Sequence, residues 1–232
     1  MYQNDFKYLV KQCLESKTLI GSGNPNAKIL FVGKEGSNHN DSKEKNINEN
    51  LECWKNHLES EIIPMFNYSI GQFPNGHTWR KYQILHDYIF QDTDKKGEIF
   101  ENNIFTTEMN QTPSKRTGDA QRDSNFNNDM ANRKSVFFKT EFIQNFKVVV
   151  LACSNYIRNT GKGNKREIDT IFGVSFCKEI EVLPKFKFWI HYNDNKTKLV
   201  IHCRQLSDSK FGSIPDDFLR KMGEEIREFQ TT

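Results

Sequence analysis

The stretch Gly23–Ser37 reads GNPNAKILFVGKEGS and combines a turn, a short apolar run and a glycine-rich exit. Its Asn-Pro-Asn sequence predicts a turn, because proline fixes φ and asparagine tolerates left-handed backbone. Residues 29–32 (ILFV) form an apolar run that is too short for a helix and typical of a buried parallel strand. In open α/β sheets, ligands bind at the carboxyl ends of the strands. The GKEGS exit therefore predicts a ligand-binding turn with a carboxylate at Glu35; a solvated loop acid is the alternative.

The rest of the chain alternates between helix and strand patterns. Apolar spacing predicts helices within residues 6–14, 47–62, 79–89 and 137–146, and a capped helix after residue 213. Apolar runs predict strands at 104–107 and 147–152 and a hairpin formed by 186–192 and 198–201. Polar segments at 38–50 and 108–128 indicate exposed loops. The pattern predicts one domain over residues 1–232, a three-layer α/β/α sandwich with a short, mostly parallel central sheet.

Composition narrows the class of protein. The 232 residues carry 33 Lys and Arg against 30 Asp and Glu, and the net charge of +3 does not by itself indicate a polyanion partner. The five cysteines form no CxxC pair, which argues against a disulfide framework or a zinc site. We see no secretion signal and no apolar run long enough for a bilayer. We therefore expect a soluble, cytoplasmic protein without a membrane partner.

A second polar turn, HCRQLS at residues 202–207, follows the last predicted strand. With both turns in place, the chain resembles the uracil-DNA glycosylase superfamily over nearly its whole length. GNPNAKILFVG looks like the GNPxAxxxFVG entry to the first motif of that family. GKEGS lies where members carry turns such as GQDPY, GEAPG or GMNPG, and HCRQLS lies where members carry HPSPLS.

The resemblance implies roles for three residues. Glu35 falls on the catalytic carboxylate of GQDPY-type members, which positions water and stabilises a cationic sugar in the transition state. His202 falls on the histidine that hydrogen-bonds the departing base. Leu206 falls on the leucine that wedges into the duplex when a base is flipped out. A structural histidine at a strand end and a core leucine are the alternatives for His202 and Leu206.

Other residues would contact phosphates or the base. Phosphates are expected at Arg204 and Ser207 of the second turn, and at Lys162 and Lys165 of a loop rich in Lys, Arg and Gly. The base pocket would be lined by Gly33, Gly36, Ser37, Thr107 and Asn110, with Phe73, Trp79 or Phe105 stacking on the base.

The chain departs from the family at the wall of the pocket. Gly36-Ser37 replaces a Pro-Tyr pair that excludes bases enlarged at C5, and removing a wall admits larger substrates. Thr107 replaces an asparagine that reads uracil, unless a register shift brings Asn110 there, and a threonine has only one hydroxyl with less reach. These two changes favour thymine or a C5-modified cytosine as well as uracil.

The cysteines also depart from one branch of the family. Members with an iron–sulfur cluster carry CxxC upstream of the first motif, whereas Cys13 is alone and Gln111 lies near the place of another cluster cysteine. We therefore expect neither an iron–sulfur cluster nor any other metal or cofactor.

The sequence thus predicts a monofunctional DNA glycosylase that releases a flipped-out pyrimidine from duplex or single-stranded DNA. Such an enzyme would serve in base excision repair or in attack on foreign modified DNA. Two alternatives stay open: a nucleic-acid-binding module of the same fold without catalysis, and an N-glycosidic hydrolase of free nucleotides. Lys34, next to Glu35, also leaves lyase chemistry open.

Overall fold

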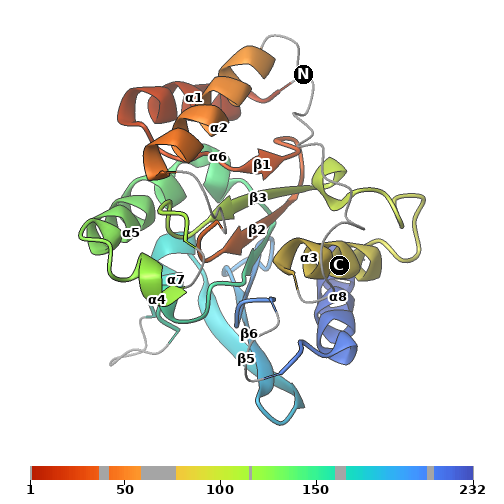
Figure 1. Ribbon diagram of the computed structural model, residues 1–232. Coiled ribbons are helices and arrows are strands. Elements are labelled where there is room, and N and C mark those ends of the chain that lie inside the picture. Colours follow the sequence, from red (N-terminus) through yellow and green to blue (C-terminus); the bar gives the residue numbers. More distant parts are fainter. Residues whose placement is uncertain are drawn as a thin grey trace.

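The computed structural model describes residues 2–36, 42–58, 77–114, 117–159, 166–207 and 212–231 (Figure 1). The strands in these residues are β1 (Ser22–Gly23), β2 (Ile29–Gly33), β3 (Ile104–Glu108), β4 (Val148–Leu151), β5 (Ser175–Leu183), β6 (Phe186–Tyr192) and β7 (Leu199–Cys203). They form one sheet in the order β1-β3-β2-β4-β7-β6-β5. The central strands β3, β2, β4 and β7 are parallel, whereas β1, β6 and β5 pair antiparallel.

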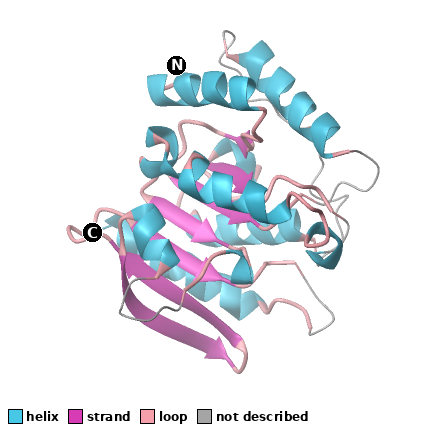
Figure 2. Ribbon diagram, turned by 90° about the vertical axis from the view of Figure 1, so that its left-hand side faces the viewer, coloured by secondary structure: helices cyan, strands magenta, loops and turns pink. Residues whose placement is uncertain are grey.

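Helices cover both faces of this sheet (Figures 1 and 2). On one face lie α1 (Asn4–Ser16), α2 (Lys43–His57), α5 (Phe126–Ser135), α6 (Glu141–Gln144) and α7 (Glu167–Phe172), together with the 3-10 turn η3 (Phe137–Lys139). On the other lie α3 (Thr78–Ile89) and α8 (Asp216–Thr231), with the 3-10 turn η2 (Phe100–Asn102). No helix of the described residues is long and apolar enough to cross a membrane. The predicted α/β class with a mostly parallel centre is confirmed.

Both cores follow from the pleat of β2. Leu30 and Val32 point into the core beneath α1 and α2, where they share a cluster with Trp54. Ile29 and Phe31 point to the other face, where the Phe31 ring lies 4.9 Å from the ring of Tyr82 on α3. A strand that is apolar at every position is buried on both sides, as parallel sheets require.

The register aligns the carboxyl ends of the parallel strands. Gly33 at the end of β2 lies opposite Glu108 of β3, and Leu151 of β4 lies opposite His202 of β7. The exits of β2 and β3 stay paired beyond the sheet, because Met109 N–H donates to the Gly33 carbonyl at 2.9 Å. The short helix α4 (Thr117–Ala120) and α5 lie beside this edge (Figure 1). Side chains that follow separate strands therefore meet there.

Several elements differ from the sequence predictions. Strand β5 was missed because its side chains are mostly exposed and its apolar alternation is short, limited to Ile180 and Val182. The β5–β6 hairpin extends past the helices (Figure 2). The helix expected over 137–146 is η3 followed by α6, separated by Thr140 in extended backbone. Of the two expected loops, 38–50 contains the start of α2, capped by Ser42, and 108–128 contains α4.

Helices α3 and α8 approach closely at Gly223, and this contact yields a stability prediction. A Cβ at Gly223 would lie 2.6 Å from the Tyr88 Cβ, so Gly223→Ala forces the two helices apart. We expect it to lower the free energy of unfolding by about 1–3 kcal/mol, despite the better helix propensity of alanine. Urea unfolding of both proteins measures this difference.

Gly118→Ala in α4 is the matched control, because its Cβ would meet nothing within 4 Å. We expect this variant to be unchanged or up to about 1 kcal/mol more stable. Equal stability of the two variants would contradict the close approach of α3 and α8.

Candidate active site

Glu35 follows β2 by two residues and is held from two sides. Its Oε1 accepts a hydrogen bond of 2.8 Å from the Thr117 hydroxyl at the start of α4. Its Oε2 is buried without a hydrogen-bond partner. Burial, and after it the Glu35 carboxylate, raise the pKa of Tyr156 far above its usual value, so this phenol stays protonated beside Glu35. The glutamate is thus a fixed, half-buried carboxylate rather than a solvated loop acid.

Lys34 adds a cation beside this carboxylate. Its Nζ lies 5.0 Å from the centroid of the Tyr156 ring, within the range of a cation–π contact. Burial lowers the pKa of Lys34, and the neighbouring Glu35 opposes that shift.

His202 of β7 is buried and its ring is fixed by the exit of β4. The imidazole Nε2 lies 2.8 Å from the Ser154 carbonyl oxygen in the 3-10 turn η4 (Ser154–Tyr156). A carbonyl only accepts, so Nε2 carries the proton and Nδ1 is left as a buried acceptor without a partner. Burial lowers the pKa of His202 to about 4, and the ring is therefore neutral at pH 7.

The expected role of His202 needs correction. In this arrangement its N–H is engaged by the backbone of Ser154 and is not offered to a departing base. The ring instead lines a cavity of about 390 Å³ together with Trp189, Arg158 and Arg204. The Trp189 and His202 rings lie 5.4 Å apart at a tilt of 30°.

Glu35 and His202 lie at the same edge of the sheet without touching. The turn η4 connects them, because Tyr156 neighbours Glu35 while Ser154 accepts from His202. Glu35 does not belong to the residues that line the His202 cavity. The chain therefore brings the two predicted catalytic residues to one region but not into one contact.

Thr107 and Asn110, expected to contact a base, are occupied by structural hydrogen bonds. The Thr107 hydroxyl donates to the Ile20 carbonyl at 2.8 Å and accepts from Arg133 Nη2 at 2.7 Å. Asn110 is fully buried, donates to the Phe126 carbonyl and accepts from Thr112 N–H. Both side chains are buried and held in place by these structural hydrogen bonds.

Leu206 and Phe105 are core residues, which corrects two further expectations. Both are fully buried, Leu206 in the core beneath α8 and Phe105 in the core beneath α1. A leucine that already fills the core is not available as a duplex wedge. Trp79 is half-buried in the first turn of α3, with its ring 5.7 Å from that of Phe100.

The two glycines of the first turn differ in their surroundings. Gly36 has open space where a Cβ would lie, whereas Gly33 is covered by the Glu108 carboxyl group. In the second turn, Arg204 and Ser207 are half-buried. The remaining predicted residues, Ser37, Phe73, Lys162 and Lys165, lie outside the described residues.

Glu108 was not among the site residues expected from the sequence. It is the last residue of β3, and a Cβ on Gly33 would lie 2.1 Å from its Oε2, so its carboxyl group rests against the end of β2. That Oε2 is buried without a hydrogen-bond partner. Burial first, and Glu35 second, raise the pKa of Glu108 to about 8, while Arg133 opposes the shift. The signal was present in the sequence: an acid ends a strand that runs parallel to β2.

Unpaired buried polar atoms concentrate at this edge of the sheet. They include Oε2 of Glu35, Oε2 of Glu108, the hydroxyls of Tyr82 and Tyr156, and Nδ1 of His202. Folded proteins pair nearly all such atoms, so this cluster makes the edge the candidate site among the described residues.

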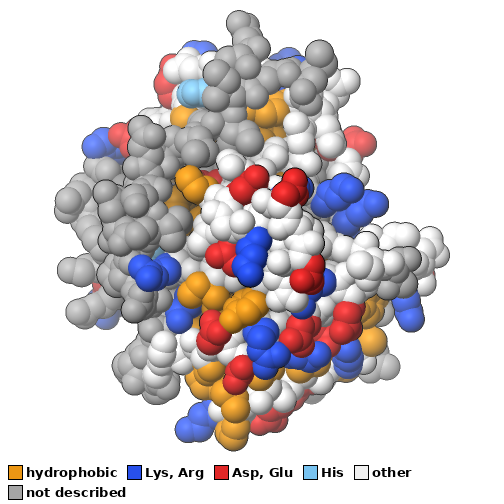
Figure 3. Space-filling view, turned by 90° about the vertical axis from the view of Figure 1, so that its right-hand side faces the viewer, with side chains coloured by type: hydrophobic (Ala, Val, Ile, Leu, Met, Phe, Trp, Pro, Cys, Tyr) orange, Lys and Arg blue, Asp and Glu red, His pale blue; other side chains and the backbone are white. Residues whose placement is uncertain are grey.

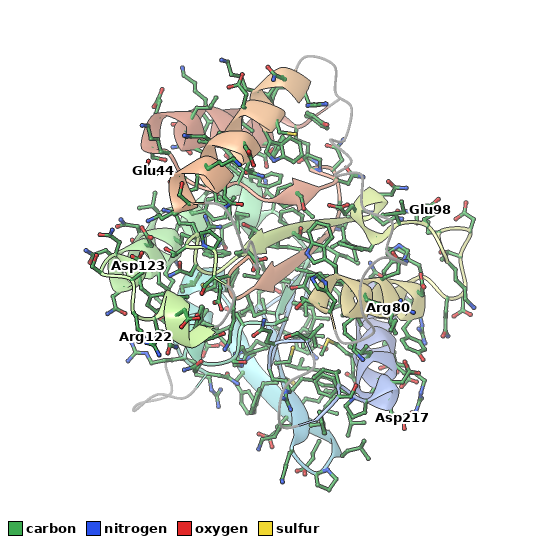
Figure 4. All side chains as sticks on the ribbon, in the orientation of Figure 1. Glu44, Arg80, Glu98, Arg122, Asp123 and Asp217 are labelled. Atoms are coloured by element: carbon green, nitrogen blue, oxygen red, sulfur yellow. The ribbon has the colours of Figure 1, made fainter. Side chains whose placement is uncertain are left out.

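The surroundings contrast with this cluster. On the face that carries α3 and α8, basic and acidic side chains are interspersed (Figure 3), and Arg220, for example, pairs with Asp217 and Glu224. Charged residues such as Glu44 and Asp217 lie at the periphery of the molecule (Figure 4). Glu108 differs from these acids because its Oε2 is buried, whereas ionised carboxylates normally lie in water.

The geometry of His202 predicts its titration. We expect histidine ¹⁵N NMR to show a neutral Nε2–H tautomer at pH 7 that gains its second proton only near pH 4. The His202→Gln spectrum assigns the signals. Because the unfolded imidazole binds a proton near pH 6.5, this group should cost stability as the pH falls from 6.5 towards 4. A normal titration near 6.5 would contradict the burial described above.

Comparison of the chain with models of protein families, with curated proteins and with solved structures found no match in any of the three.

Proposed function

We propose that the protein is a monofunctional DNA glycosylase, which hydrolyses the N-glycosidic bond of a flipped-out pyrimidine. The observation that carries the proposal is the Glu35 carboxylate, fixed on one oxygen by Thr117 and unpaired on the other, at the carboxyl end of β2. The motif resemblance at both turns and the parallel order β3-β2-β4-β7 support it.

The chemistry suits such a carboxylate. As the bond between C1′ and the base breaks, positive charge develops on the sugar, and a fixed negative charge in a partly dry site stabilises it. Glu35 orients the attacking water with its unpaired Oε2 and accepts a proton from it. Thr117 prevents the carboxylate from rotating away, so little reorganisation accompanies the reaction.

The substrate we propose is uracil, thymine or a C5-modified cytosine in DNA. Open space at Gly36 supports an enlarged base, because no side chain of the described residues lies within 4 Å of the place of a Cβ there. An extruded base meets Glu35 only outside the stack, so base flipping is part of the proposal.

The test measures release of base from DNA carrying uracil, thymine opposite guanine, or 5-hydroxymethylcytosine. We expect single-turnover release from at least one of them, and a loss of at least about 100-fold in Glu35→Gln, which keeps the shape but removes the charge. Glu44→Gln, at an exposed acid in the first turn of α2, is the control and should retain full activity.

Other outcomes identify other functions. Tight DNA binding without release, equal in wild type and Glu35→Gln, would indicate a non-catalytic binding module. Hydrolysis of free nucleotides with only a weak dependence on salt would indicate a nucleotide hydrolase, because binding through several DNA phosphates weakens steeply with salt. Either result overturns the proposal.

A further inference from the structure

We propose that Glu108 is a second catalytic residue, which enters the reaction protonated and donates its proton to the departing base. This inference rests on the proposed glycosylase function and assigns the leaving-group half of that reaction. It concerns a residue at the end of β3, whereas the attack on the sugar is assigned to Glu35 after β2.

The position of Glu108 is set by two neighbouring strands. Parallel pairing places it opposite Gly33, and hydrogen bonds from Met109 and Asn110 N–H to the Gly33 and Lys34 carbonyls hold the two exits together. Only a glycine at position 33 leaves room for the carboxyl group, since a Cβ would lie 2.1 Å from its Oε2. The side chain is thereby confined to the edge that carries Glu35.

The groups that face Glu108 favour its neutral form. Arg133 of α5 is the one described cation that acts on it, and the Arg133 hydrogen bonds go to the Glu108 and Leu19 carbonyls and to the Thr107 hydroxyl instead of to the carboxyl group. Tyr82 of α3 and Cys153 after β4 are neutral, because burial raises the pKa of both. Glu35 adds like charge, and two neighbouring carboxyls do not readily ionise together.

A departing base needs a proton donor, and the described residues offer few. His202 is neutral, and its N–H donates a hydrogen bond to the Ser154 carbonyl. The Tyr82 and Tyr156 phenols hold their protons too tightly to transfer them, because burial raises the pKa of each far above its usual value. Glu108 combines a buried, unpaired oxygen with a pKa of about 8, close to the pH at which a general acid works best.

The proposed steps balance. The bond between C1′ and the base nitrogen breaks, and its electron pair leaves with the base. The Glu108 proton moves to the base, which leaves as a neutral molecule. Water then adds to C1′ and gives a proton to Glu35, and exchange with solvent restores both carboxyl groups. Pairs of acids whose environments separate their pKa values serve in this way in other glycosidic hydrolyses.

Glu108→Gln tests the inference, because glutamine keeps the shape and a hydrogen-bond donor but has no proton to transfer. We expect release of the preferred base to fall about 100-fold or more. Release of the pyrimidine with fluorine at C5 in place of the native hydrogen or substituent, which leaves readily without protonation, should fall at least tenfold less. In wild type, release should decline above about pH 8, and this decline should be missing in the variant. Glu101→Gln is the matched control: this acid is also buried with a pKa raised to about 7, but it precedes β3 at the far end of the sheet.

A second measurement does not depend on activity. A carboxyl with a raised pKa in the folded protein costs stability as the pH rises from about 4.5 to 8, so the melting temperature of Glu108→Gln should rise relative to wild type over that range. A constant difference in melting temperature would show an ionised Glu108 and overturn the inference.

The failures of the two proposals can be told apart. Base release by wild type with unchanged release by Glu108→Gln leaves the glycosylase proposal standing and overturns the role of Glu108. Equal losses on the base and its 5-fluoro analogue show a positioning effect and also overturn proton donation. Absence of release from every substrate overturns both proposals together.

Discussion

Parallel pairing of β2 with a neighbour on each side is the constraint on which the rest of the structure depends. Because β2 is buried at every position, helices cover both of its faces. The parallel pairing also brings the carboxyl ends of four strands to one edge. Polar residues lie at this edge because the turns that follow the buried strands begin there. The turn after β4 then contacts residues that follow β2 and residues of β7, so the edge behaves as one unit.

Two acids at this edge occupy different environments although both follow neighbouring strands. Glu35 has a hydroxyl donor on one oxygen and is only half-buried. Glu108 is pressed against the backbone of Gly33, and its buried oxygen has no donor. The division of labour that we propose between base and acid rests on these surroundings and not on the residue type, which is the same.

Much of the fold could be predicted from the sequence, because apolar runs and their spacing report burial directly. The strands β2, β4 and β7, and the helices α1, α3 and α8, all carry such patterns. Edge strand β5 could not be predicted in this way, because most of its side chains are exposed. At the site, Glu35 could be singled out by its place after a strand. The hydrogen bonds that hold Thr107 and Asn110 could not be predicted, since their partners Arg133 and Phe126 lie far along the chain.

The β5–β6 hairpin has a consequence for the behaviour of the protein in concentrated solution. A nine-residue strand at the margin of a sheet is a template for association with other chains. Here Lys178, Glu179 and Glu181 interrupt that margin with charges of both signs, and Lys178 pairs with the buried Glu225 of α8. Copies stacked parallel and in register would place like charges directly opposite one another, which disfavours fibre-like growth from the projecting hairpin.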